Sequence, residues 1–228
     1  MRLVLTGAGS GIGEVLARRL TDRGDDLVLL ARSDARAAEL GRAHSGAQVL
    51  VADLADPGTL NGLGRQVDGP VDALVHVAGV VELGPVARLR LADWEEQLAV
   101  NLTAPAVLTR ELLPHLRQAR GTVVFVNSGA GLAAHAEWSG YAASKFGLRG
   151  LADALRAEEA DHGVRVTTVY PGRTATPMQE KVHGQEGKDY DASAWISAET
   201  VAGTILHVLD LPADATIPDV TVRPGPGS

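Results

Sequence analysis

The stretch Leu3-Val4-Leu5-Thr6-Gly7-Ala8-Gly9-Ser10-Gly11-Ile12-Gly13 decides the fold of this chain. Its three leading apolar residues form a candidate strand, and the glycines that follow lead directly into a helix-like segment of about residues 12–23. In this context Gly7 permits a sharp turn, Gly11 lets the backbone approach a diphosphate, and Gly13 permits close packing of helix on sheet. Free amide groups at the start of the helix then attract phosphate oxygens.

The spacing of these glycines departs from the common dinucleotide-binding pattern G-x-G-x-x-G, because three residues separate Gly7 from Gly11 and one separates Gly11 from Gly13. A glycine-rich turn that binds nothing is the alternative interpretation. The position between a strand and a helix favours a cofactor loop. The contacts expected from it are those of Gly7, Ser10, Gly11, Ile12 and Gly13.

Downstream of this loop, short apolar runs alternate with helix-like stretches. Runs that read as buried parallel strands occur at about residues 3–5, 27–30, 49–51, 73–75, 123–126 and 166–169, with a weaker seventh at 216–222, which Pro218 interrupts. Helices are expected at about residues 12–23, 35–44, 58–67, 92–117, 141–161 and 198–209. This alternation predicts an α/β protein with one doubly wound, parallel seven-stranded sheet and helices on both faces.

Composition narrows the class of protein. The 228 residues fit a single domain, 1–228, and the net charge of -7 without a Lys/Arg run argues against nucleic-acid binding. The chain has no cysteine, and its seven histidines lack metal-ligand spacing, so no metal site is expected. No apolar stretch reaches the ~18 residues of a membrane span, and the first residues do not resemble a signal peptide. We therefore expect a cytoplasmic protein.

The end of the second strand bears on the choice between NAD and NADP. An acidic residue there binds the ribose 2′-hydroxyl of NAD, whereas an arginine suits the 2′-phosphate of NADP. The chain has Arg32 and Ser33 at this point, which favours NADP, although Asp34 leaves NAD open. After the next two strands, Asp53-Leu54 could contact adenine or cap a turn, and Ala78-Gly79 could approach the ribose.

Three polar side chains carry the candidate chemistry. Tyr141 and Lys145 are four residues apart and share a helix face, and Ser128 precedes them in a glycine-rich turn. A neighbouring ammonium is expected to lower the tyrosine pKa from its usual ~10. Such a phenol can donate a proton to a forming alkoxide. Taken singly, a core tyrosine, a snorkelling lysine and a capping serine are the simpler interpretations.

Together these motifs resemble the short-chain dehydrogenase/reductase family, and the resemblance covers nearly the whole chain. It implies a Rossmann-like fold, with Tyr141 as general acid or base, Lys145 lowering its pKa and binding the nicotinamide ribose, and Ser128 polarising the substrate carbonyl. Asn101 matches the family's active-site asparagine, which holds a water linked to the lysine. The segment 171–176 resembles the loop that passes the nicotinamide, and its expected contacts come from Pro171, Gly172, Thr174 and Thr176.

One departure from the family pattern follows the fourth strand. The family's Asn-Asn-Ala-Gly reads His76-Val77-Ala78-Gly79 here, which predicts a less rigid sheet end. Residues of about 176–197 leave room for only a short substrate lid, and residues 224–228 are expected to fray. Arg173 could bind an acidic substrate or pair with Glu137, and Trp195 could form an apolar wall or anchor the lid.

The resulting prediction is an NADPH-dependent reductase of a small ketone or aldehyde, or an enzyme of the reverse oxidation. The alternative is a catalytically silent NADP-binding sensor or scaffold. By the family's habit, the two long helical segments pair across a two-fold axis, which predicts a homodimer or homotetramer. Small residues would permit that packing: Ala104, Ala106, Ala142, Ala143, Ala152 and Ala154.

Overall fold

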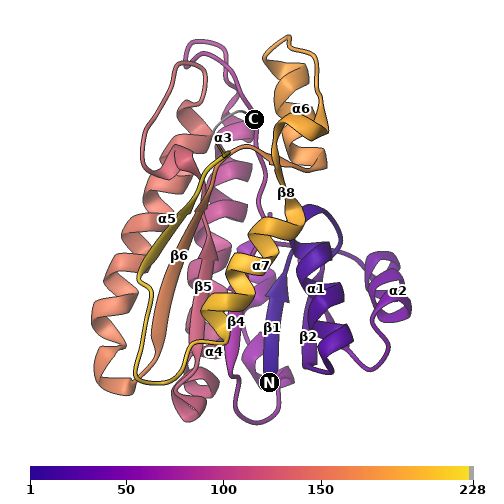
Figure 1. Cartoon of the computed structure of the whole chain (residues 1–228), viewed down its shortest axis with the longest axis vertical. Coiled ribbons are helices and arrows are strands. Elements are labelled where there is room, and N and C mark those ends of the chain that lie inside the picture. The colour runs from indigo at the N-terminus through magenta and orange to yellow at the C-terminus, as the bar shows by residue number, and fades with distance from the viewer. Residues whose placement is uncertain (226–228) are drawn as a thin grey trace.

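A computed structural model describes residues 1–225 and contains the predicted parallel sheet (Figure 1). Its seven strands lie in the order β3-β2-β1-β4-β5-β6-β9, and every neighbouring pair is parallel. The strands are β1 Arg2–Thr6, β2 Asp26–Ala31, β3 Gln48–Val51, β4 Ala73–His76, β5 Thr122–Val126, β6 Arg165–Pro171 and β9 Asp219–Val222. The doubly wound α/β prediction is confirmed.

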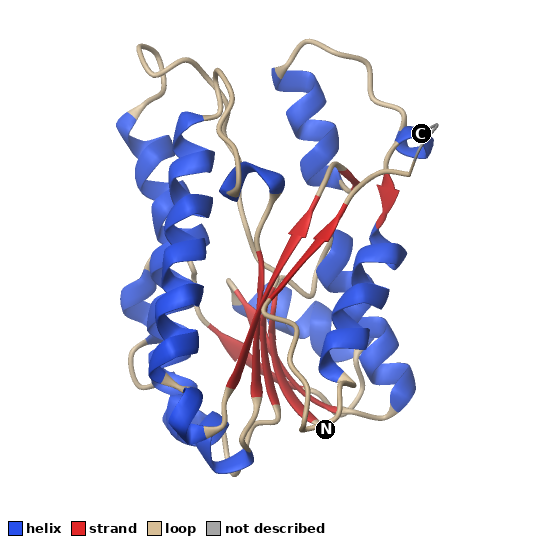
Figure 2. Cartoon of the chain, turned by 60° about the vertical axis from the view of Figure 1, so that its left-hand side comes forward, coloured by secondary structure: helices blue, strands red, loops and turns tan. Residues whose placement is uncertain are grey.

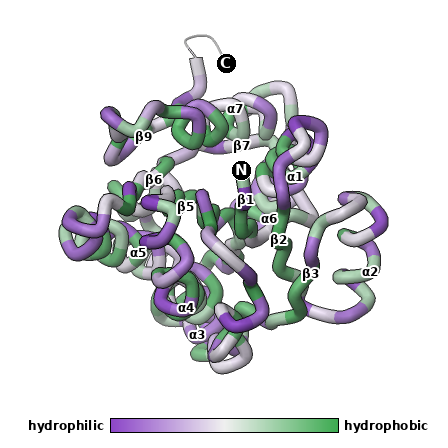
Figure 3. The backbone as a smooth tube through the Cα atoms, turned by 90° about the horizontal axis from the view of Figure 1, so that it is seen from below, coloured by the Kyte–Doolittle hydropathy of each residue, from purple (hydrophilic) through white to green (hydrophobic). Residues whose placement is uncertain are grey.

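Helices cover both faces of the sheet, as Figure 2 shows. One face carries α1 (Gly11–Arg23), α2 (Asp34–Ala43) and α7 (Ala198–Leu209) around one apolar core. The other carries α3 (Leu91–Leu98), α4 (Ala104–Ala119) and α5 (Ser139–Glu158), of which α4 and α5 build a second core with the sheet. Figure 3 shows mostly hydrophobic colour along β2, as expected for a strand buried on both faces.

Two predicted helices have a different form. The segment 58–67 contains two short 3₁₀ turns, Pro57–Leu60 and Leu63–Gln66, because Gly62 between them adopts a left-handed conformation with φ of 78°. The segment 92–117 is interrupted by a π-helical stretch, Ala99–Thr103, between α3 and α4. Pro105 has no N–H to donate to the preceding turn, which gives a physical reason for the change of hydrogen-bonding pattern there.

The strand order reverses on either side of β1, so that β2 and β4 flank it. Ligands of open α/β sheets bind beyond the carboxyl ends of the strands at such a point. In Figure 1 this end of the sheet lies at the top, below α6 (Pro177–Gln185). The short strands β7 (Thr174–Ala175) and β8 (Ile196–Ser197) pair beside it and hold the two ends of the lid segment together.

Residues 224 and 225, the described part of the predicted tail, follow closely after β9. A Cβ on Gly172 would lie 3.2 Å from Cδ of Pro224, so residue 224 packs beside β6. Residues 226–228 of the predicted frayed tail lie outside the described residues. Within residues 1–225, no helix combines the length and apolar character needed to span a bilayer.

Candidate active site

The glycine-rich loop after β1 has the geometry of a phosphate cradle. Gly7 and Gly11 have φ angles of 77° and 55°, which other residues rarely adopt. A Cβ on Gly13 would overlap the carbonyl oxygen of Gly7, so the helix can start this close to the sheet only with glycine there. Ser10 forms no side-chain cap on α1, which leaves the first amides of the helix free for an anion. The loop therefore fits a dinucleotide diphosphate.

A cavity of about 1120 Å³ extends from this loop along the carboxyl ends of the strands. It is lined by most of the residues predicted from sequence, whereas Gly13 and Asn101 lie behind its wall. The predicted residues on the wall are Gly7, Ser10, Gly11, Ile12, Arg32, Ser33, Asp53, Leu54, Ala78, Gly79, Ser128, Tyr141, Lys145, Pro171, Gly172, Thr174 and Thr176.

Two arginines, Arg32 and Arg36, line the end of the cavity beside β2, together with the carboxylates of Glu39 and Asp53. Arg32 is exposed there and forms no ion pair with another residue of the described chain. Ser33 caps α2, because its hydroxyl oxygen accepts a hydrogen bond of 3.3 Å from the amide of Arg36. One oxygen of Asp53 accepts from the amide of Ala55 at 3.0 Å, so this residue does cap a turn, as one of the two interpretations held.

Sequence reasoning missed Arg36, which also lines this end of the cavity. Its guanidinium donates to the carbonyl oxygen of Gly9 and pairs with Glu39, one turn along α2. A Cβ on Gly9 would overlap the guanidinium of Arg36, so glycine at position 9 leaves room for the arginine side chain. The spacing of Arg36 from Arg32, four residues apart beside a helix start, was the signal in the sequence.

Ser128 and Tyr141 meet on the wall of the cavity that the segment 171–176 also lines. Ser128 accepts a hydrogen bond of 3.1 Å from the amide of Ala130, and its hydroxyl is hydrogen-bonded to the phenol of Tyr141. Tyr141 is 6% exposed and its ring packs edge-on against Trp138, with centroids 5.8 Å apart. The structure thus brings together the alcohol and the phenol that the sequence placed thirteen residues apart.

The expected direction of the tyrosine pKa shift is wrong for this structure. Burial raises the pKa of Tyr141 above its usual value, and the hydrogen bond with Ser128 offsets the rise in part. The Nζ atom of Lys145 lies 5.7 Å from the centroid of the tyrosine ring, beside the ring rather than at its hydroxyl. Loss of hydration therefore sets the direction of the shift, and the phenol keeps its proton at neutral pH.

Lys145 is itself deeply buried, at 3% exposure. Its Nζ donates to the carbonyl oxygen of Val126 at 3.2 Å, and burial lowers the pKa of the ammonium to about 8. Burying a lysine in the cavity wall costs folding free energy, because the charged ammonium loses its hydration. Buried ionisable side chains with strongly shifted pKa values are common at catalytic and ligand-binding sites.

Asn101 lies in the π-helical stretch and braces the same region. Its side chain accepts from the amide of Val80 at 2.9 Å and donates to the carbonyl of Val80 at 2.9 Å and to Ser144 at 3.0 Å. Local π turns are frequent at functional sites, since they re-aim one side chain. Here Asn101 fixes the loop after β4 to α5.

Asn127 was also missed by sequence reasoning. Its carboxamide oxygen accepts from the amide of Ser128 at 2.8 Å, and its nitrogen donates to the carbonyl of Lys145 at 3.0 Å. The side chain is buried and links the serine turn to helix α5, so it holds Ser128 and Lys145 in register. Its place directly before Ser128 at a strand end was the available signal.

Other contacts brace the end of β4, where the family pattern has two asparagines and this chain has His76 and Val77. His76 is buried, stacks on Phe125 with ring centroids 4.9 Å apart, and bonds Thr109 at 2.9 Å through Nε2. Burial lowers its pKa to about 3, so it stays neutral at physiological pH. The Thr6 hydroxyl accepts from the amides of Val77 and Ala78 at 3.1 and 3.2 Å. The sheet end is therefore well braced, contrary to expectation.

The lid helix α6 closes the other end of the cavity and is tied down at two places. Glu82, in the loop after β4, pairs with Lys181 at 2.7 Å and also bonds Gln185. Arg173 forms a two-pronged ion pair with Glu186, at 3.0 and 2.6 Å, and does not pair with Glu137. Within residues 1–225, no three His, Asp or Glu side chains gather as a metal site would require.

The fold and the site together define a dinucleotide-binding oxidoreductase. Residues 2–187 match the family described as short chain dehydrogenase, so the chain belongs to that family and is an NAD(P)-dependent oxidoreductase of its type. An uncharacterized oxidoreductase of Staphylococcus epidermidis is 28% identical over 226 residues, 97% of this chain and 96% of that protein.

Two further proteins extend the comparison. Human retinol dehydrogenase 5 is 36% identical over 181 residues, which cover 76% of this chain and 57% of that protein. The structure of a putative NAD(P)-dependent gluconate 5-dehydrogenase from Beutenbergia cavernae, with bound NADP, matches with a TM-score of 0.84 at 28% identity. That match covers 97% of this chain and 94% of the other.

Proposed function

We propose that this chain catalyses the NADPH-dependent reduction of a small ketone or aldehyde, or the reverse oxidation of an alcohol. The observation that carries the proposal is the meeting of Ser128, Tyr141 and Lys145 on one cavity wall that also includes the phosphate loop. The whole chain, 1–228, would act as one catalytic domain, with residues of about 176–197 as its lid.

The roles follow from the chemistry of each side chain. A bound nicotinamide dinucleotide supplies the hydride and is oxidised as the carbonyl carbon is reduced. Tyr141, whose phenol is protonated at neutral pH, donates that proton to the carbonyl oxygen as the hydride reaches the carbon. Ser128 donates a hydrogen bond to the same oxygen and fixes its position. In the reverse direction the Tyr141 phenol first loses its proton, and the phenolate then accepts the proton of the alcohol.

Lys145 and Asn101 support this step. The buried ammonium lies beside the tyrosine ring and is suited to bind the ribose hydroxyls of the nicotinamide half. Asn101 holds the loop after β4, whose Gly79 lies close to Lys145: a Cβ on that glycine would be 3.7 Å from Nζ. Pro171, Gly172, Thr174 and Thr176 line the same part of the cavity, where the nicotinamide would lie.

The preference for NADP over NAD is supported by the charge at the opposite end. Arg32 has no ion-pair partner among the described residues, and Arg36 stands one turn further along. A 2′-phosphate would give Arg32 the anionic partner it lacks, and the Ser33 hydroxyl can donate a further hydrogen bond. Asp53, Leu54 and Ala78 would contact the adenosine.

The names of the relatives are consistent with alcohol–carbonyl chemistry. One is called a retinol dehydrogenase and another a putative gluconate 5-dehydrogenase with NADP bound. Both names denote the oxidation of a hydroxyl group, which is the reverse of the reduction proposed here.

The test is NADPH consumption by the purified protein over a panel of ketones and aldehydes, with NADH in parallel. The proposal predicts turnover of at least part of the panel and faster reaction with NADPH. Tight NADPH binding without turnover of any compound would contradict it and favour the alternative, a catalytically silent sensor or scaffold.

We also propose a cytoplasmic homodimer or homotetramer. Three of the alanines expected at a helix–helix interface, Ala104, Ala142 and Ala152, are instead buried within the subunit. Ala143 and Ala154 remain on the outer surface of α5, where Phe146 is 41% exposed. Light scattering at micromolar concentration tests the assembly, and a monomer would contradict it.

A further inference from the structure

The cavity around Tyr141 has an apolar wall separate from the two cores of the sheet. Buried Val81, Ala130 and Val182 form a cluster with the tyrosine, and Leu83, Trp138 and Met178 pack against it. These residues come from the loop after β4, the serine turn, α5 and the lid. A substrate whose carbonyl reaches Tyr141 therefore extends its substituent over aliphatic and aromatic surface.

Four lysine and arginine side chains line the cavity in the described part of the chain. Arg32 and Arg36 stand at the adenosine end, and Lys145 lies beside the tyrosine ring. Arg173 is the cation that remains to receive a negatively charged group on a substrate.

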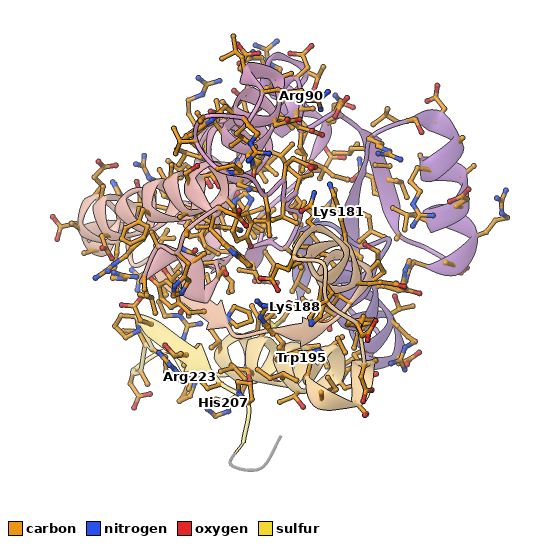
Figure 4. All side chains as sticks on the ribbon, turned by 90° about the horizontal axis from the view of Figure 1, so that it is seen from above. Arg90, Lys181, Lys188, Trp195, His207 and Arg223 are labelled. Carbon is orange, nitrogen blue, oxygen red and sulfur yellow. The ribbon has the colours of Figure 1, made fainter. Side chains whose placement is uncertain are left out.

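The guanidinium of Arg173 is already engaged. Its Cζ lies 5.8 Å from the Trp138 ring and 5.5 Å from the Trp195 ring, and both its terminal nitrogens donate to Glu186. The Glu186 side chain is 11% exposed, and the hydrogen bonds from Arg173 lower its pKa. Figure 4 looks down on this end of the molecule and labels Trp195 together with Lys188, which pairs with Glu186 from the exposed side at 3.2 Å.

With Lys145 assigned to the nicotinamide ribose, a substrate carboxylate would find no unpaired cation at this end of the cavity among the described residues. It would have to displace the largely buried Glu186 from Arg173, leaving it the exposed Lys188 as a partner, or lie unpaired against the apolar cluster. Glu96 adds a further negative charge on the cavity wall, at an exposed position on α3. Both routes disfavour an anion.

We propose that the substrate is an uncharged ketone or aldehyde with an apolar substituent, and that oxo acids are excluded because Glu186 occupies the arginine that would bind them. This inference rests on the proposed reductase function. Arg173, between two tryptophans and joined to the lid, acts as a structural tie and not as a substrate anchor.

Matched substrates test the inference. The test compares kcat/KM for methyl benzoylformate with that for benzoylformate, and kcat/KM for ethyl acetoacetate with that for acetoacetate, each with NADPH at pH 7. The expected kcat/KM is about 100-fold higher for each ester, since the acid would leave a buried charge unpaired. Equal or faster turnover of the acids would overturn the substrate class and leave the reductase function intact. Absence of turnover with every carbonyl compound, while NADPH still binds, would overturn the reductase function itself.

Two variants of the lid test whether Glu186 is the reason that oxo acids are excluded. Glu186→Gln removes the charge that occupies Arg173, so it should raise kcat/KM for the acids and narrow the ester-to-acid ratio about tenfold. Glu180→Gln removes the same charge from an exposed position on the same helix and should leave the ratio unchanged. An unchanged ratio in a folded Glu186→Gln protein, or an equal change in the control, would overturn the assignment.

Discussion

Replacing Lys145 by methionine should stabilise the folded protein while removing its activity. Methionine has a similar length and no charge, so it fits the buried site without the loss of hydration that the ammonium suffers. The pKa of Lys145 is lowered from 10.5 to about 8 by burial. At about 1.4 kcal/mol for each pKa unit, the buried charge costs about 3 kcal/mol of folding free energy at neutral pH.

Part of this gain is offset in the variant. Lys145 donates a hydrogen bond of 3.2 Å to the carbonyl of Val126, and its loss costs about 1 kcal/mol. The net expectation for Lys145→Met is a rise of about 2 kcal/mol in the free energy of unfolding at pH 7, measured by urea denaturation.

The pH dependence of the stability difference between wild type and Lys145→Met gives a sharper check. The lowered pKa of Lys145 determines whether this difference grows or shrinks as the pH rises. Below pH 8 the lysine is charged in both the folded and the unfolded protein, so the folded protein bears the full free-energy cost of burying the ammonium. Between pH 8 and 10 the folded protein releases the proton while the unfolded chain keeps it, so wild-type stability rises relative to the variant. The stability difference should therefore shrink by about 2 kcal/mol between pH 7 and pH 10.

Lys181→Met serves as the control, because Lys181 is half exposed and forms only a surface ion pair with Glu82. It should change stability by less than ~1 kcal/mol. A Lys145→Met protein that is less stable than wild type at pH 7, or whose difference from wild type does not change with pH, would refute the reasoning.

Two other predictions concern the cofactor end. Arg32→Ala should weaken NADPH binding by about 1.5–3 kcal/mol more than NADH binding in calorimetry, and equal effects would show that Arg32 does not contact the 2′-phosphate. Gly13→Ala should abolish cofactor binding and lower the melting temperature, because its Cβ would overlap the Gly7 carbonyl. Gly41→Ala, in open space on α2, should instead stabilise the protein by about 0.5–1 kcal/mol, and a loss of stability there would contradict the helix geometry.

The sequence was sufficient to predict the seven strands and their parallel arrangement. Strands such as β4 and β5 are buried on both faces, so their residues form continuous apolar runs that cannot be mistaken for half-exposed strands. The sharp turn after β1 was equally predictable, because Gly7 and Gly11 adopt conformations that glycine alone tolerates easily.

What the sequence could not provide are quantities set by tertiary packing. The pKa direction of Tyr141 depends on how much water its hydroxyl loses, and a spacing of four residues from Lys145 carries no information on that. Arg173 was expected either to bind an acidic substrate or to pair with Glu137. Its partner is Glu186 on the lid, whose path no periodic pattern specifies. Arg36 reaches Gly9, 27 residues away in the sequence, through the tilt of α2.

The most direct measurement of the central claim is kcat/KM for carbonyl reduction by Tyr141→Phe, together with its Kd for NADPH. Phenylalanine keeps the ring that packs against Trp138 and removes the hydroxyl that Ser128 bonds. If the phenol delivers the proton, turnover falls by about 100-fold or more while NADPH binding stays within a few-fold of wild type. Wild-type turnover by Tyr141→Phe would show that another group is the acid.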